Sequence, residues 1–164
     1  MYMIKNVSNA NKKGFTLIEL LVVIGILAVL LAITIIAINP ARQFANANNT
    51  ARRSAVTQVL NALGAYVAEN QGALPAEVTA LVADTPTELN ATNFPNLCAL
   101  LVPTYISALP TDPALNDGDG VEAADCAVVP PVWDTNYTVS RDANDRVTVA
   151  APDAENAAVI SVTR

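Results

Sequence analysis

An uninterrupted apolar segment constrains this chain more than any other feature of its sequence. From Leu20 to Ile38 there are 19 residues without a charge, and Thr34 has the only polar side chain among them. As an α-helix, this segment would be about 28 Å long at 1.5 Å per residue, which is enough to cross the hydrocarbon core of a bilayer. The sequence therefore predicts a membrane-spanning helix near the N-terminus.

The basic residues around this segment predict its orientation. Lys5, Lys12 and Lys13 are the only lysines of the chain, and the next basic residue after the segment is Arg42. Because lysine and arginine are retained on the cytoplasmic side of a span, we expect the N-terminus in the cytoplasm and the rest of the chain outside it.

Glu19 directly precedes this apolar segment. A carboxylate costs about 2.5–3.5 kcal/mol at the centre of a bilayer and less toward its edge. One interpretation is a charge tolerated at the cytoplasmic edge, and the other is a charge that finds its partner when copies of the chain assemble. A cleaved secretory signal peptide, with Ala45-Asn46-Ala47 as its cleavage site, would leave Glu19 unexplained and would have a shorter apolar part.

Residues 12–24, KKGFTLIELLVVI, resemble the class III signal of type IV pilins and the related pseudopilins. The resemblance implies that residues 1–14 are a basic leader peptide, which a prepilin peptidase removes on the cytoplasmic side after Gly14. Phe15 would become the first residue of the mature chain, with a methylated amine. Glu19 falls at the fifth position of that mature chain, where the family has a glutamate.

The chemistry of these residues agrees with such a signal. Glycine has no Cβ, so Gly14 leaves the scissile peptide open to a protease. In a filament, Glu19 of one copy can pair with the Phe15 amine of a neighbour, and the attraction is stronger in a low-dielectric core than in water. The expected partners are other copies of the chain, the prepilin peptidase and an inner-membrane assembly platform.

The apolar pattern of residues 15–38 predicts a transmembrane helix, and the resemblance implies that this helix is also the filament core. Residues 39–72 are expected to continue it as an amphipathic helix. Pro40 predicts either a kink or the first turn of a new helix. Gly72 is a helix-end signal. The apolar stripe of this second part consists of Val56, Val59, Leu60, Leu63 and Val67.

The three arginines of this helix, Arg42, Arg52 and Arg53, are expected on its polar faces. Two interpretations are open for each of them. The side chain is either solvated or paired with an acidic residue of an adjacent subunit.

Residues 73–164 are predicted to form a globular head outside the cytoplasm. Short helices are expected near residues 75–83 and 96–101. Alternating side chains predict antiparallel strands at 135–141, 146–152 and 158–164. Trp133 is expected in the core, and the sheet face toward the helix stripe is expected to carry Tyr137, Val139, Val147 and Val149. The fold class is thus α+β, a long N-terminal helix packed on a small antiparallel sheet, as in type IV pilins.

The two cysteines of the chain, Cys98 and Cys126, both lie in this head. In an exported head they are predicted to form a disulfide, which would contribute on the order of 3.5 kcal/mol in the chain-entropy model. The alternative is two unrelated buried thiols.

Four acidic residues gather in a glycine-containing segment of the head: Asp117, Asp119, Glu122 and Asp125. Their oxygen ligands suit calcium, although the spacing is not that of an EF-hand. The alternative is an acidic, solvated loop. The nearby LPTDP sequence (Leu109–Pro113) resembles an element of major pseudopilins of type II secretion, which bind calcium in this general region.

The amino-acid composition argues against two classes of function, nucleic-acid binding and catalysis. The chain has no histidine and a net charge of −6. Without residues 1–14 it has six arginines and 15 acidic residues, so it is more strongly acidic. A nucleic-acid partner is not expected because it needs a basic surface. An enzyme is not expected, since no catalytic constellation is found, and no cofactor other than calcium is predicted.

The leading expectation is a structural subunit of a type IV pilus-like filament, anchored once in the inner membrane and then part of a periplasmic or extracellular filament. One alternative is the major pseudopilin of a type II secretion system, which LPTDP favours. Another is a membrane-anchored extracytoplasmic binding protein.

Overall fold

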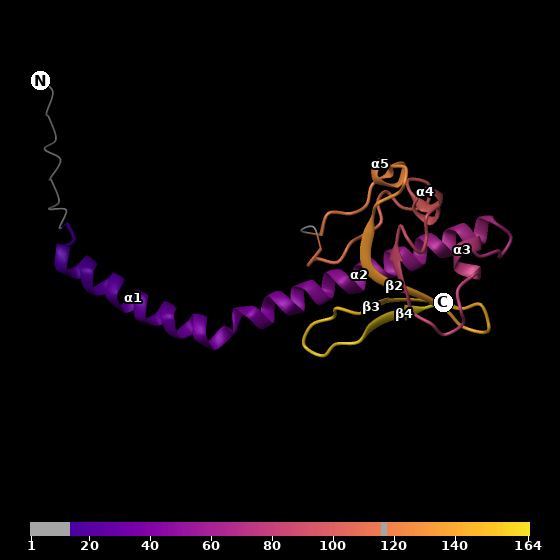
Figure 1. Ribbon diagram of the computed structural model, residues 1–164. Coiled ribbons are helices and arrows are strands. Elements are labelled where there is room, and N and C mark those ends of the chain that lie inside the picture. Colours follow the sequence, from indigo (N-terminus) through magenta and orange to yellow (C-terminus); the bar gives the residue numbers. More distant parts are fainter. Residues whose placement is uncertain (1–13, 116–117) are drawn as a thin grey trace, which may run out of the picture. The chain divides into compact units, whose positions relative to one another are not determined.

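The computed structural model of this chain describes residues 14–115 and 118–164 (Figure 1). The chain divides into two compact units, with the boundary between Pro40 and Ala41. The first unit contains the long helix α1 (Leu17–Ile38), and the second contains the head with its antiparallel sheet. The predicted α+β class, with a long apolar N-terminal helix and a small antiparallel sheet, is confirmed.

Helix α1 begins and ends at residues that suit helix termini. Thr16 is the N-cap, and Thr16 and Glu19 form a reciprocal capping box. The helix ends at Ile38 because Pro40 disfavours the helical region for the residue before it. Asn39 adopts a left-handed conformation with φ 48°, which asparagine tolerates. Of the two interpretations of Pro40, the structure has the second, since Pro40 is the first residue of α2.

Helix α2 (Pro40–Glu69) contributes one face to the core of the head. Val56, Val59, Leu60 and Leu63 of the predicted stripe are buried, and Val67 is half-buried. After the helix, Gln71 and Gly72 have positive φ angles, and the Gly72 amide donates to the Val67 carbonyl. This arrangement satisfies a carbonyl of the last turn, so Gly72 ends the helix as the sequence predicts.

The sheet is an antiparallel meander in the order β1-β2-β3-β4. Its strands are β1 (Thr87–Asn90), β2 (Asp134–Arg141), β3 (Val147–Ala151) and β4 (Ile160–Thr163). Val139 of β2 is opposite Val149 of β3, and Val149 is opposite Val162 of β4. Alternate residues of β2 and β3 are buried, among them Tyr137 and Val147. These side chains belong to the same core cluster as the α2 stripe, which is why α2 and the sheet form one compact unit.

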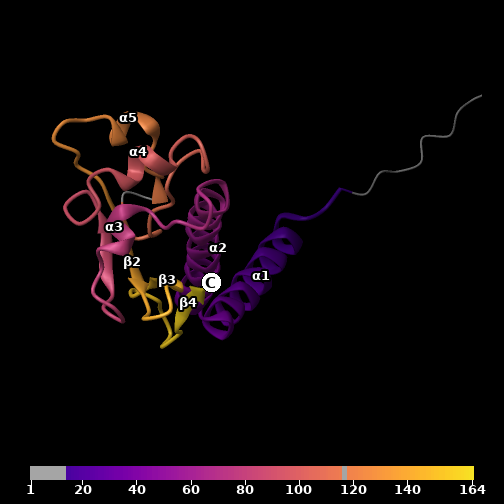
Figure 2. The same cartoon turned by 90° about the vertical axis from the view of Figure 1, so that its right-hand side faces the viewer.

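Three short helices complete the described part of the head: α3 (Ala76–Thr79), α4 (Leu97–Leu101) and α5 (Ala123–Cys126). Helix α3 is shorter than the segment 75–83 predicted from the sequence. Helix α4 lies where a helix was expected, whereas α5 and β1 were not predicted. Helices α4 and α5 lie together at one end of the head, with β3 and β4 at the other (Figures 1 and 2).

Candidate functional site

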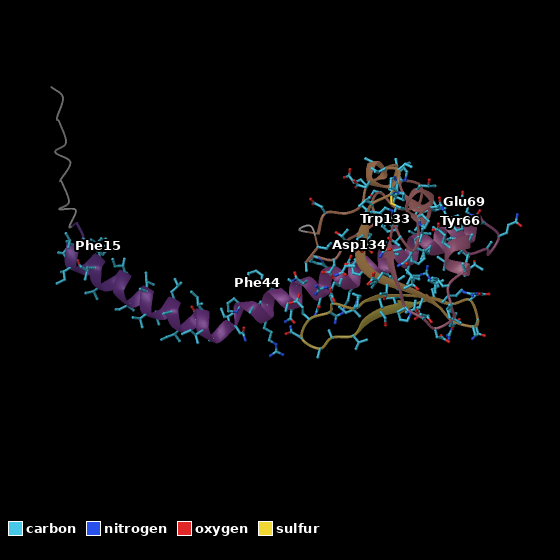
Figure 3. All side chains as sticks on the ribbon, in the orientation of Figure 1. Phe15, Phe44, Tyr66, Glu69, Trp133 and Asp134 are labelled. Carbon is cyan, nitrogen blue, oxygen red and sulfur yellow. A yellow bond between two sulfur atoms is a disulfide. The ribbon has the colours of Figure 1, made fainter. Side chains whose placement is uncertain are left out.

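The Gly14–Phe15 peptide precedes the first helix. Residues 14–16 lie outside any helix or strand, and among the described residues no atom beyond the chain neighbours of Gly14 would contact a Cβ added there. Phe15 lies at the start of α1 with 86% of its surface exposed (Figure 3). A peptide outside a helix, with open space around it, is sterically accessible to a protease. The rest of the predicted leader, residues 1–13, lies outside the described residues.

Glu19 lies on the first turn of α1, where its carboxylate caps the helix. Glu19 Oε2 accepts hydrogen bonds from the Thr16 amide at 3.1 Å and from the Thr16 hydroxyl at 2.9 Å. In return, the Glu19 amide donates to the Thr16 hydroxyl at 3.3 Å. The carboxylate also lies at the positive end of the helix dipole. In a single copy, then, Thr16 supplies the hydrogen bonds of the Glu19 carboxylate, one from its amide and one from its hydroxyl.

The surface of α1 is apolar on every side and uncovered. All of its residues are exposed, and the Thr34 hydroxyl, its one polar group between Leu20 and Ile38, donates to the Leu31 carbonyl at 2.9 Å. Among the described residues, α1 is the helix long and apolar enough to cross a membrane. A helix that is apolar all round is stable in lipid or packed among other apolar surfaces, so the length and composition of α1 suit a membrane anchor.

Arg52 is buried in the head, so its predicted place on a polar face of α2 is wrong. Arg52 is 1% exposed as a residue, and Asp112 opposite it is fully buried. Arg52 Nε and Nη2 donate to the two carboxylate oxygens of Asp112 at 2.6 Å and 2.9 Å, and Nη1 donates to Glu155 Oε1 at 2.9 Å. Bidentate pairing satisfies the guanidinium and gives the contact a fixed geometry.

The neighbours of this ion pair hold the C-terminal part of the head on α2. Asn49 accepts from Arg52 and from the Glu155 amide, and it donates to the Glu155 carbonyl at 2.7 Å. Asn48 donates to Glu155 Oε1 at 2.9 Å. Asp112 is the aspartate of LPTDP, so that sequence has a structural role here. Arg53, the next residue, is exposed as predicted.

The two carboxylates that pair with Arg52, those of Asp112 and Glu155, both have a pKa below its ordinary value. Burial alone would raise the pKa of Asp112, but hydrogen bonds from Arg52 and from the Ala114 amide outweigh it and lower the pKa below its ordinary value. Hydrogen bonds from Asn48 and Arg52 lower the pKa of Glu155. Burial, together with the charge of Asp112, raises the pKa of Tyr137 to about 12.

These shifts predict how the stability of the head depends on pH. A carboxyl with a lowered folded-state pKa stabilises the fold above its unfolded pKa of about 4, and the contribution is lost as pH falls through the folded pKa. We therefore expect the free energy of unfolding to fall below about pH 4, measured as the urea midpoint at pH 7, 4 and 3. In Asp112→Asn the loss of unfolding free energy between pH 7 and pH 3 should be smaller than in the wild-type protein. An equal loss in the variant and the wild type would mean that the Asp112 carboxyl does not cause it.

Cys98 and Cys126 are joined by a disulfide, with a Cα–Cα distance of 5.4 Å. Cys98 is in α4 and Cys126 is the last residue of α5. The bond therefore ties these two short helices together at one end of the head. Among the described residues no cysteine is free.

The acidic residues predicted to bind calcium have other contacts. Glu122 and Asp125 form a capping box at the start of α5, with the Glu122 amide donating to Asp125 Oδ2 at 2.9 Å. The Asp119 carbonyl accepts from Thr111 at 2.6 Å. Asp117 lies outside the described residues. In the described ranges, no three histidine, cysteine or acidic side chains are grouped to hold a metal, and the calcium site stays a prediction.

Comparison with known proteins places a family motif on the first helix. Residues 9–38 match the family model of the prokaryotic N-terminal methylation motif. The match spans the expected cleavage site, Glu19 and all of α1. A search of curated proteins and a search of solved structures found no match.

Proposed function

We propose that this chain, which carries the class III signal of type IV pilins and pseudopilins, is a structural subunit of a type IV pilus-like filament. The motif supports a type IV pilin-like or pseudopilin protein in general. Removal of residues 1–14 would leave a membrane-anchored chain that begins at Phe15, and polymerisation would transfer α1 from lipid to a bundle of identical helices. The head would lie on the periplasmic or extracellular side.

The uncovered apolar surface of α1 is the observation that carries this proposal. Every residue of α1 is exposed in the single copy, including the large side chains along its whole length. Such a surface needs an apolar environment, and other copies of α1 provide one that excludes both water and lipid. Glu19 then requires a charged partner in that environment, and the amine of a neighbouring Phe15 is the cation that cleavage creates.

Mass spectrometry of the mature N-terminus tests this proposal. In cells with a prepilin peptidase, the chain should begin Phe-Thr-Leu-Ile-Glu with one methyl group on the amine. Gly14→Val should accumulate as the full-length precursor, because a branched side chain crowds the scissile peptide. A mature chain that begins near Asn48 would mean a secretory signal peptide and would refute the proposal.

The second candidate is the major pseudopilin of a type II secretion system, which LPTDP favours. Both candidates share processing, anchoring and polymerisation, so the mature N-terminus does not separate them. Deletion of the gene does. Loss of surface filaments from sheared cells would favour the pilus, and periplasmic accumulation of normally secreted proteins would favour the pseudopilus.

A further inference from the structure

The head exposes an apolar loop that no other described residue covers. Residues 127–132, Ala-Val-Val-Pro-Pro-Val, carry no charge, and we call them the valine loop. Val129 is 91% exposed, and Val128 and Val132 are exposed as well. Exposed apolar residues that lie next to one another are typical of interaction sites.

The valine loop is held at both ends. Cys126, before it, is in the disulfide with Cys98, and Trp133, after it, is buried in the core. Two consecutive prolines restrict the backbone between these points. A loop restricted in this way loses little conformational entropy when it binds, which favours its use as a contact surface.

An open apolar groove of about 620 Å³ lies elsewhere on the head. Its floor is formed by Leu60 and Leu63, and Val67, Ala68 and Leu74 line its walls. The groove is lined by residues of the last part of α2 and by Val147, the first residue of β3. The orange segment after α5 runs at the other end of the head from β3 in both views (Figures 1 and 2). No residue of the valine loop lines it, so the loop does not fill the groove of its own chain.

The charges at the two surfaces are complementary. Arg164 lines the groove, and its guanidinium lies across Gly64, with Nη1 2.8 Å from the position of an added Cβ. Asp145, the other charged residue of the groove, pairs with Arg141. The valine loop is flanked by the acidic residues Asp125 and Asp134, and in the described part of the chain neither of them nor Arg164 forms an ion pair.

We infer that the valine loop of one copy docks into the apolar groove of a neighbouring copy, with an acidic flank of the loop facing Arg164. The inference rests on the proposed function, because it gives the filament a contact between heads. Since the loop and the groove are different surfaces, the contact is head-to-tail, and a contact of this kind builds an open polymer when the rotation between copies does not close a ring. A loop of this size makes a weak contact alone, and packing of α1 between copies raises its effective concentration.

The other large exposed side chain near α2, Phe44, fits this groove less well. Phe44 is 71% exposed, and Arg42 lies two residues before it in the sequence. Docking Phe44 would bring the Arg42 guanidinium toward that of Arg164, and like charges repel. The electrostatics of the groove therefore favour the valine loop.

Cysteine cross-linking in sheared filaments of the full-length protein tests the contact. Val129→Cys and Ala68→Cys, combined in one chain and oxidised, should give a ladder of covalent oligomers on a non-reducing gel. Each single variant is the control and should give no ladder. Filaments of the double variant without a ladder would overturn the inference, and a ladder from Phe44→Cys with Ala68→Cys would place α2 in the groove and overturn it as well.

A charge at the tip of the loop gives an independent test. Val129→Asp should lower filament yield by about tenfold or more, because a carboxylate would be buried in an apolar groove. Val159→Asp is the matched control, since Val159 is also 91% exposed but lies outside the loop. Equal yields of the two variants would overturn the inference. Absence of filaments from the wild-type chain would instead refute the proposed function itself.

Discussion

Glu19→Ala should abolish filaments while leaving the chain in the membrane. Without the carboxylate, the Phe15 ammonium of a neighbouring subunit would be buried unpaired, at a cost of about 3–5 kcal/mol. This cost lowers the equilibrium constant for adding a subunit by about 100-fold or more. The measurement is the filament yield in sheared fractions by electron microscopy, with the amount of membrane-bound protein determined by immunoblot.

The capping role of Glu19 calls for a control, and Glu19→Gln provides it. The Gln side chain can accept the same hydrogen bonds from Thr16, so it keeps the helix cap and removes only the charge. If pairing with the Phe15 amine is the role of Glu19, the Gln variant should lose filaments as the Ala variant does. Normal filaments in Glu19→Gln would mean that the cap matters and the charge does not.

Arg52→Met should destabilise the head by about 3–5 kcal/mol, because it leaves the carboxylate of Asp112 buried without its partner. Trp133 is the only tryptophan of the chain and is buried, so its fluorescence reports unfolding of the head. The measurement is a urea titration of the full-length protein in detergent micelles.

Arg53→Met is the matched control for this change. Arg53 is next to Arg52 on the same helix but is exposed, so its loss should change the free energy of unfolding by less than about 0.5 kcal/mol. The double variant Arg52→Met, Asp112→Leu should recover much of the lost stability, since both charges are then absent. Equal effects of Arg52→Met and Arg53→Met would contradict the role given to the buried pair.

The parts of the fold that repeat a simple pattern were predictable. The apolar segment specified α1, and the spacing of the valines and leucines specified which face of α2 enters the core. Alternation in residues 135–141 and 146–152 specified the β2–β3 hairpin, whose turn lies at 142–145. In each case a local feature, the length of the apolar run for α1 and the period of the side chains for the others, matches one element, and few long-range contacts are needed to decide it.

Arg52 was missed although the sequence contains a signal for it. It lies four residues before Val56 and seven before Val59, so the apolar stripe, continued backward, passes through Arg52 and Asn49. The hydrophobic pattern assigns a charged residue to solvent unless its partner is known. The partners here, Asp112 and Glu155, are 60 and 103 residues away, and local periodicity carries no information about them.

Strand β1 and helix α5 were missed for a different reason. Strand β1 has four residues, and Leu89 is its one apolar side chain. Its pairing with β2 depends on a contact across more than forty residues, which stabilises a sequence of low strand propensity. Helix α5 is a single turn held by its capping box and the disulfide, and neither the cap geometry nor the cysteine pairing is visible in a local side-chain period.

In the proposed filament, the disulfide would have a mechanical consequence for a subunit under tension. Cys98 and Cys126 are 28 residues apart, so a force that pulls on the ends of the chain passes through the sulfur bridge and bypasses the loop between them. At about 3.4 Å per residue, roughly 95 Å of chain cannot be drawn out while the bridge is intact. The head would therefore stretch over a shorter distance before the polymer transmits the load to the next copy.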